Sequence, residues 1–172
     1  MERHRLAGME RDRVTWTSPP VGWYKANWDV AIDKLTRRVG ISMIVLIAAR
    51  CLTQGGPLTP ILAEETLALY HAACHCKDLD GKPIILEGDA LQVVTTVNSS
   101  EQSWSHFGHL VAYTKIVLQM LLEWSCRHVR RKANVIAHRL AKAAVQHVID
   151  NTWWEKFLIV FFRELQALFS TD

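Results

Sequence analysis

The chain has 172 residues, of which 22% are charged and 49% hydrophobic, and its formal net charge is +3. This length suits one domain with a buried core, and this composition excludes a chain that is disordered throughout. The small positive charge permits a polyanionic partner without requiring one.

The sequence carries no pattern typical of secretion or of a membrane span. The charged start MERHRLAGMERDR is not followed by an apolar stretch. The apolar run 157–162 is much shorter than the roughly 20 residues of a spanning helix. The four cysteines lack a zinc-ligand spacing and are interpreted as reduced thiols. We therefore expect an intracellular protein, nuclear or cytoplasmic, with no membrane partner.

The first elements follow from hydrophobic alternation. Residues 1–15 are rich in Arg and Glu and are expected to form a flexible lead-in, followed by a segment with turn-forming Pro and Gly at 16–22. Residues 23–29 alternate and predict a strand, and the β-branched run 39–49 predicts a second strand buried on both faces. Between 48 and 58 the signal for a strand is weak.

Helical and strand patterns alternate over the rest of the chain. The predicted helices are 62–76, 89–97, 107–122 and 134–148, the predicted strands are 82–87 and 123–129, and a last helix or extended tail is predicted over 153–169. This order predicts an α/β fold, a mixed sheet of about five strands with helices on both faces. We expect one domain over 16–150, with a helical tail over 151–172 packed on it.

Three acidic residues occur where strands end or helices begin. Asp29 lies late in the first predicted strand, Glu65 in the first turn of the 62–76 helix, and Asp89 directly after an apolar strand. Carboxylates in such places can line one crevice, and hard cations such as Mg²⁺ would relieve their mutual repulsion. Each also has a structural alternative, because Asp89 can cap a helix and Glu65 can interact with a helix dipole.

Four sequence patterns stand in order along the chain. They consist of Trp16, Pro19, Pro20, Gly22, Lys25, Asn27 and Asp29; of Glu65, Ala68 and Ala72; of Glu87 and Asp89; and of His128, Val129, Arg131, Ala133, Asn134, Ala137, His138, Leu140 and Ala141. Because these four patterns occur in this order, the chain resembles the type-1 ribonuclease H superfamily over residues 16–172. The resemblance is greatest to its plant reverse-transcriptase-like branch, whose domains occur alone or as relics of retroelements.

The resemblance implies a metal-dependent endonuclease that hydrolyses the RNA strand of RNA–DNA hybrids. The carboxylates that match Asp29, Glu65 and Asp89 would hold two divalent ions, which activate the attacking water and stabilise the leaving oxygen. His138 stands where the family usually has a fourth acidic ligand; as an auxiliary ligand it would suit Mn²⁺ better than Mg²⁺. His128 matches a histidine that assists proton transfer or product release, with a structural hydrogen bond as the alternative.

Basic residues cluster in the last predicted strand and the loop after it. Such side chains hold phosphates without reading sequence, and a hybrid would be recognised by groove shape and 2′-hydroxyl groups. We assign Arg130, Arg131 and Lys132 to this contact, with a solvated loop as the alternative. Asn134 either contacts the hybrid or caps the helix that follows it. The expected partner is therefore an RNA–DNA hybrid, bound by a monomer without sequence specificity.

Departures from the family pattern favour a second hypothesis. Residues 40–50 keep only the first glycine of the family's second-strand hairpin, and Leu46, Ile47 and Ala48 are poor turn formers. With His138, this supports a catalytically degenerate retroelement relic that binds nucleic acid without efficient cleavage. A third hypothesis is an interaction domain that binds no nucleic acid. Because all three carboxylates are present, the enzyme remains the leading hypothesis.

Overall fold

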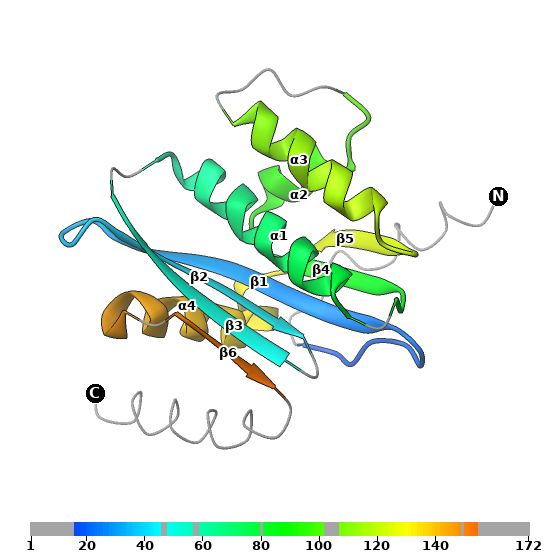
Figure 1. The fold of residues 1–172 in the computed structure, drawn as a ribbon, viewed down its shortest axis with the longest axis horizontal. Helices are drawn as coiled ribbons and strands as arrows, with labels where there is room; N and C mark the ends of the chain where they lie inside the picture. Colours follow the sequence, from blue (N-terminus) through cyan, green and yellow to red (C-terminus); the bar gives the residue numbers. More distant parts are fainter. Residues whose placement is uncertain are drawn as a thin grey trace.

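The sheet is mixed and has six strands, in the order β5-β4-β1-β2-β3-β6 (Figure 1). The computed structural model describes residues 16–45, 48–56, 59–79, 81–101, 107–148 and 150–154. The strands are β1 (Tyr24–Asp33), β2 (Arg38–Val45), β3 (Ala48–Gly55), β4 (Ile84–Gly88), β5 (Trp124–His128) and β6 (Asn151–Trp154). Strand β4 is parallel to both β1 and β5, and the other pairs are antiparallel. The predicted mixed sheet is confirmed, with one strand more than expected.

Helices cover both faces of this sheet, as predicted. Helices α1 (Ile61–Lys77), α2 (Leu91–Asn98) and α3 (Gly108–Gln119) lie on one face, and α4 (Val135–His147) lies on the other (Figure 1). A 3₁₀ turn, η1 (Arg131–Ala133), leads into α4. Every helix in the described part of the chain is too short or too polar to span a bilayer.

The two faces of strand β1 differ in polarity. Its even-numbered residues from Tyr24 to Val30 belong to the hydrophobic core, together with Leu69 and other residues of α1. Its odd-numbered residues Lys25, Asn27 and Asp29 are also buried, although they are polar or charged. Because successive side chains of a strand point to opposite faces, the Lys-x-Asn-x-Asp pattern is one polar stripe along β1.

The hairpin that the sequence left in doubt is present. Val45 of β2 pairs with Ala48 of β3, so only residues 46 and 47, which lie outside the described residues, connect the two strands. The prediction of one strand over 39–49 is therefore wrong. An unbroken apolar run gives no signal for the point at which the chain reverses direction, and the pairing of β3 with both β2 and β6 decides it.

Small side chains on β2 and β3 let α4 pack closely on the sheet. A Cβ atom at Gly40 would overlap the carbonyl oxygen of Ala141, which explains the one family glycine that remains in this region. The hydroxyl groups of Ser42 and Thr53 donate hydrogen bonds to carbonyl oxygens of α4, and the one from Ser42 reaches Ala137 over 2.6 Å. These contacts fix the helix that carries His138.

Two boundaries differ from the prediction. Residues 151–154 form strand β6 instead of the start of a helical tail, because they pair with the outer edge of β3. Residues 155–172 and the predicted lead-in at 1–15 lie outside the described residues. Helix α2 begins at Leu91 after Ala90, and no side chain caps it, so Asp89 does not act as its cap.

Candidate active site

Three carboxylates from distant parts of the sequence meet at one point. Asp29 belongs to β1, Glu65 lies near the start of α1, and Asp89 follows β4 directly. One oxygen atom from each lies within 4.8 Å of the others. The parallel pairing of β1 with β4 brings the two aspartates together. Gly88, between Glu87 and Asp89, leaves room for the Trp28 ring, which a Cβ atom there would overlap.

Burial makes this cluster unfavourable when all its members are charged. Asp29 is fully buried, and burial followed by the charge of Asp89 raises its pKa from 3.8 to about 7. Burial, followed by the charges of Asp29 and Asp89, raises the pKa of Glu65 from 4.5 to about 8. Oε2 of Glu65 is buried and finds no hydrogen-bond partner among the described residues. Each observation indicates that the described residues do not fully neutralise the cluster.

The donor set fits a hard divalent cation. Mg²⁺ and Mn²⁺ bind carboxylate oxygens, and an ion beside Asp29, Glu65 and Asp89 would neutralise the repulsion among them. The unpartnered oxygen of Glu65 would gain a ligand bond in exchange for its lost hydration. The residues present can therefore hold the metal that the sequence led us to expect.

His138 lies beside this cluster on α4, as its position in the pattern suggests. Its Nδ1 atom lies 2.8 Å from Oδ2 of Asp29. Burial, assisted by the charges of Arg131 and Lys142, lowers the pKa of His138, which favours the neutral ring. A neutral imidazole can hydrogen-bond to Asp29 or donate a nitrogen lone pair to a metal.

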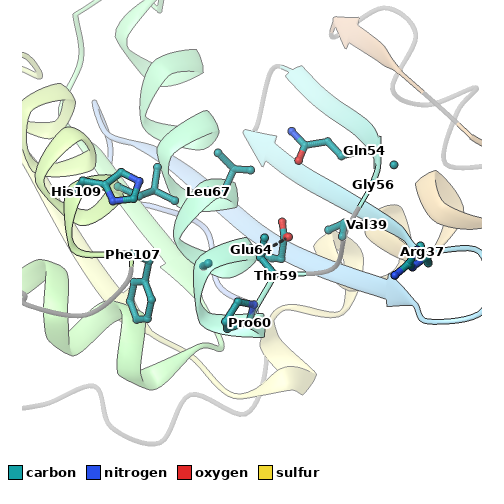
Figure 2. Close-up of a pocket in the computed structure, with 13 residues that line it drawn as sticks. Arg37, Val39, Gln54, Gly56, Thr59, Pro60, Glu64, Leu67, Phe107 and His109 are labelled. Carbon is teal, nitrogen blue, oxygen red and sulfur yellow. Dashed lines mark hydrogen bonds between the residues drawn. The ribbon is translucent and has the colours of Figure 1, made fainter.

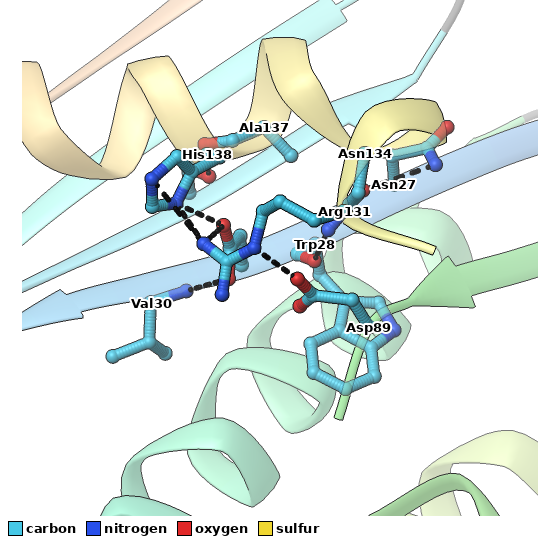
Figure 3. Close-up of polar contacts among 10 residues, drawn as sticks. Asn27, Trp28, Val30, Asp89, Arg131, Asn134, Ala137 and His138 are labelled. Carbon is cyan, nitrogen blue, oxygen red and sulfur yellow. Dashed lines mark hydrogen bonds and ion pairs between the residues drawn. The ribbon is translucent and has the colours of Figure 1, made fainter. Parts of the chain in front are cut away.

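Arg131 also lies at the cluster, although the sequence led us to expect it on a phosphate. Its Nε forms an ion pair with Oδ2 of Asp89 (Figure 3). One terminal nitrogen lies 3.4 Å from Oδ2 of Asp29. The guanidinium also contacts the ring of His138. The patterns alone gave no signal for this arrangement, because η1 and the two aspartates meet only in the folded chain.

Asn134 occupies an interior position instead of a surface one. Its side chain amide donates a hydrogen bond to the Trp28 carbonyl oxygen over 2.9 Å and accepts one from Asn27 over 3.2 Å. The residue is 1% exposed, and its side chain does not cap α4. The expected side-chain cap of α4 is therefore wrong, because the Asn134 amide instead joins η1 and α4 to β1. The expected contact with the hybrid stays a prediction.

A buried polar network lies on β1 and β4, the two strands that position Asp29 and Asp89. Lys25 and Glu87, on neighbouring strands, form an ion pair over 2.9 Å, and their side chains are 1% and 2% exposed. Lys25 also donates to the Thr17 carbonyl oxygen, and Asn27 accepts a hydrogen bond from the Trp16 ring nitrogen. Sequence reasoning did not assign this network, although polar residues at alternate positions of an otherwise apolar strand were a usable signal.

The remaining predicted site residues lie near the cluster. His128 ends β5 and pairs with Gly88, which precedes Asp89, so its backbone stands at the same edge of the sheet. Arg130 and Lys132 flank Arg131 and are exposed. Their predicted roles in proton transfer and phosphate binding remain proposals.

Two hollows adjoin the start of α1 and the end of β1. The first, of about 450 Å³, lies between the β2–β3 hairpin, α1 and α3; Glu64 lines it and accepts a hydrogen bond from Thr59 (Figure 2). The second, of about 500 Å³, lies beside the carboxylate cluster and is lined by Lys34, Lys142 and His138 among others. Glu64 therefore lines a different hollow from the one that lies beside the cluster of Asp29, Glu65 and Asp89.

The raised pKa values predict how stability depends on pH without metal. The folded chain holds protons on Asp29 and Glu65 that the unfolded chain has lost, so the free energy of unfolding falls as pH rises from about 4 to about 8. We expect the melting temperature in EDTA to be at least about 2–4 °C lower at pH 8 than at pH 5.5. Circular dichroism melts would measure it, with Glu65→Gln as the control that should reduce the slope. A melting temperature that rises over this interval would contradict the assignment.

Comparison with protein families matches residues 40–144, more than half of the chain, to the reverse transcriptase-like family. A comparison with curated proteins found no significant match. Among solved structures, RNase H1 from the halophilic archaeon Halobacterium salinarum NRC-1 is similar with a TM-score of 0.66 at 21% identity, over 73% of this chain and 99% of that one.

Two further solved structures show the same fold. The N-terminal RNase H domain of a Mycobacterium tuberculosis protein has a TM-score of 0.65 at 15% identity, over 73% of this chain and 94% of that one. LC11-RNase H1 in complex with an RNA/DNA hybrid has a TM-score of 0.62 at 14% identity, over 73% of this chain and 98% of that one. The chain has the ribonuclease H fold and belongs to the reverse transcriptase-like family.

Proposed function

We propose that this protein is a metal-dependent endonuclease that hydrolyses the RNA strand of RNA–DNA hybrids. The observation that carries the proposal is the convergence of Asp29, Glu65 and Asp89, within 4.8 Å of one another, in a ribonuclease H fold. The proposal includes two divalent ions, Mg²⁺ or Mn²⁺, and a monomeric, intracellular protein of plant retroelement origin.

The chain would position the reacting groups with residues from three elements. Asp29 and Asp89 would hold the ions from the sheet side, and Glu65 would hold them from α1. When bound, such ions activate a water molecule and stabilise the leaving oxygen of the phosphodiester. His138 would orient Asp29 through the 2.8 Å contact or serve as an auxiliary ligand, and His128 would move a proton from the end of β5.

The surface around the cluster supports binding of a nucleic-acid backbone. Arg130 and Lys132 are exposed on the turn beside the site, and Lys34 and Lys142 line the adjacent hollow. Cationic side chains on two sides of the cluster would hold phosphates without contacting base edges. Since LC11-RNase H1 was solved with an RNA/DNA hybrid, a hybrid is the substrate to test first.

The test is cleavage of an end-labelled RNA–DNA hybrid by the full chain, with Mg²⁺ and Mn²⁺ in separate reactions. We expect cleavage of the RNA strand in the hybrid and none of single-stranded RNA, double-stranded RNA or double-stranded DNA. Asp89→Asn keeps the size of the side chain and removes a ligand charge, so it should remove the activity. If the folded parent protein cleaves no substrate with either metal, the proposal that it is an enzyme is wrong.

A non-cleaving binding domain is the second candidate, favoured by two observations. His138 replaces the fourth carboxylate of the family, and Arg131 already neutralises part of the cluster. The same preparation distinguishes the two candidates. Salt-dependent binding of the hybrid without cleavage would support the degenerate domain, and no binding would support an interaction domain instead.

A further inference from the structure

Arg131 is the one cation that the described residues place between two members of the carboxylate cluster. Its Nε pairs with Oδ2 of Asp89, and its terminal nitrogen lies 3.4 Å from Oδ2 of Asp29. Both oxygens belong to carboxylates that a metal would require. A guanidinium and a divalent ion in contact with the same oxygen atoms would repel each other, so their binding is competitive.

The Arg131 side chain contacts two of the three carboxylates in the cluster. Arg131 lies against Asp29 and Asp89, whereas Oε2 of Glu65 has no partner among the described residues. The described residues therefore leave Oε2 of Glu65 without a partner, whereas the guanidinium occupies the side between the two aspartates.

The same side chain can leave the cluster without unfolding the protein. The Arg131 side chain is 54% exposed and projects from the short turn η1, while Asn134 at the end of that turn is anchored to β1. An exposed arginine keeps its charge when released and can bind a phosphate through its planar fork.

We propose that Arg131 is a tethered counter-cation that a divalent ion must displace from Asp29 and Asp89 to complete the metal site. This inference rests on the proposed function, because it concerns the same metal. It assigns Arg131 two successive partners: the two aspartates before the site is filled, and a phosphate of the nucleic acid afterwards. His138 adds to the effect, since an imidazole beside Asp29 in place of a fourth carboxylate brings no negative charge to attract a second ion.

The test is calorimetric titration of the full chain with MnCl₂, without nucleic acid, for the parent, Arg131→Gln and Lys132→Gln. Arg131→Gln should tighten Mn²⁺ binding about tenfold, because the competing charge is lost. Lys132→Gln removes the same charge from the neighbouring position and should change the affinity by less than about twofold. The rise in melting temperature on adding Mn²⁺ should also be largest for Arg131→Gln.

A second variant keeps the test informative if Arg131→Gln does not fold without metal. Arg131→Lys retains the charge but cannot bridge two carboxylates with a planar fork, so it should bind Mn²⁺ more tightly than the parent. If the folded Arg131 variants bind Mn²⁺ with the same affinity as the parent or more weakly, the proposal that Arg131 is a counter-cation is wrong. If Asp89→Asn binds Mn²⁺ as well as the parent does, the metal site itself and the proposed function fail instead.

Discussion

Glu65→Gln is expected to lower the rate of hybrid cleavage at least about a thousandfold, equivalent to about 4 kcal/mol of transition-state stabilisation. Glutamine has nearly the same shape as glutamate but no negative charge, so the loss would come from the metal site. Glu65 is 7% exposed and its Oε2 is unpartnered among the described residues, so no described hydrogen bond of this oxygen is lost. Because burial and neighbouring charges raise its pKa to about 8, neutralising it should stabilise the metal-free fold.

The chain offers a matched control one residue earlier. Glu64 is also buried on α1, but its carboxylate lines the other hollow and accepts a hydrogen bond from Thr59, which glutamine can still accept. The Glu64→Gln variant should therefore cleave the hybrid at a rate within about threefold of the parent rate. The measurement is single-turnover cleavage of the labelled hybrid in Mg²⁺. Equal losses in both variants, or activity in Glu65→Gln, would remove Glu65 from the metal site.

Lys25→Met is expected to lower the free energy of unfolding by about 3–5 kcal/mol. The substitution leaves Glu87 charged and buried without its partner, which lies 2.9 Å away and is itself 1% exposed. It also removes the hydrogen bond from Lys25 to the Thr17 carbonyl oxygen and the contact of its ammonium group with the Trp16 ring. Removing one partner of a buried pair costs far more than the pair contributes, since the remaining charge stays desolvated.

The measurement is urea unfolding of the full chain, followed by circular dichroism. Lys25→Met with Glu87→Leu is the informative control, because removing both charges should recover most of the loss. A double variant as unstable as the single one would locate the cost in the lost contacts of Lys25 instead. A change below about 1 kcal/mol for Lys25→Met would show that Glu87 finds water or another partner.

Local patterns determined much of the fold and the identity of the candidate ligands. Helix α1 was predicted to within a residue at each end, since Ala and Leu at helical spacing carry a strong signal. The stripe Lys25, Asn27 and Asp29 reflects the two-residue period of a strand, which is visible in any sequence. Strand β6 was missed, because an edge strand pairs with a neighbour about a hundred residues away and leaves little local trace.

The sequence by itself determined that three carboxylates, a mixed sheet and a family pattern occur together. Only the tertiary structure decided what each polar residue contacts. Asn134 follows Asn27 by 107 positions, and only folding brings their side chains together and buries both. Arg131 likewise looks like a phosphate ligand in the sequence, until β1, β4 and η1 place two carboxylates beside it. Charged and polar side chains interact with the groups that lie near them in space, whatever their separation in the sequence. Hydrophobic periodicity, in contrast, indicates only which face of an element is buried.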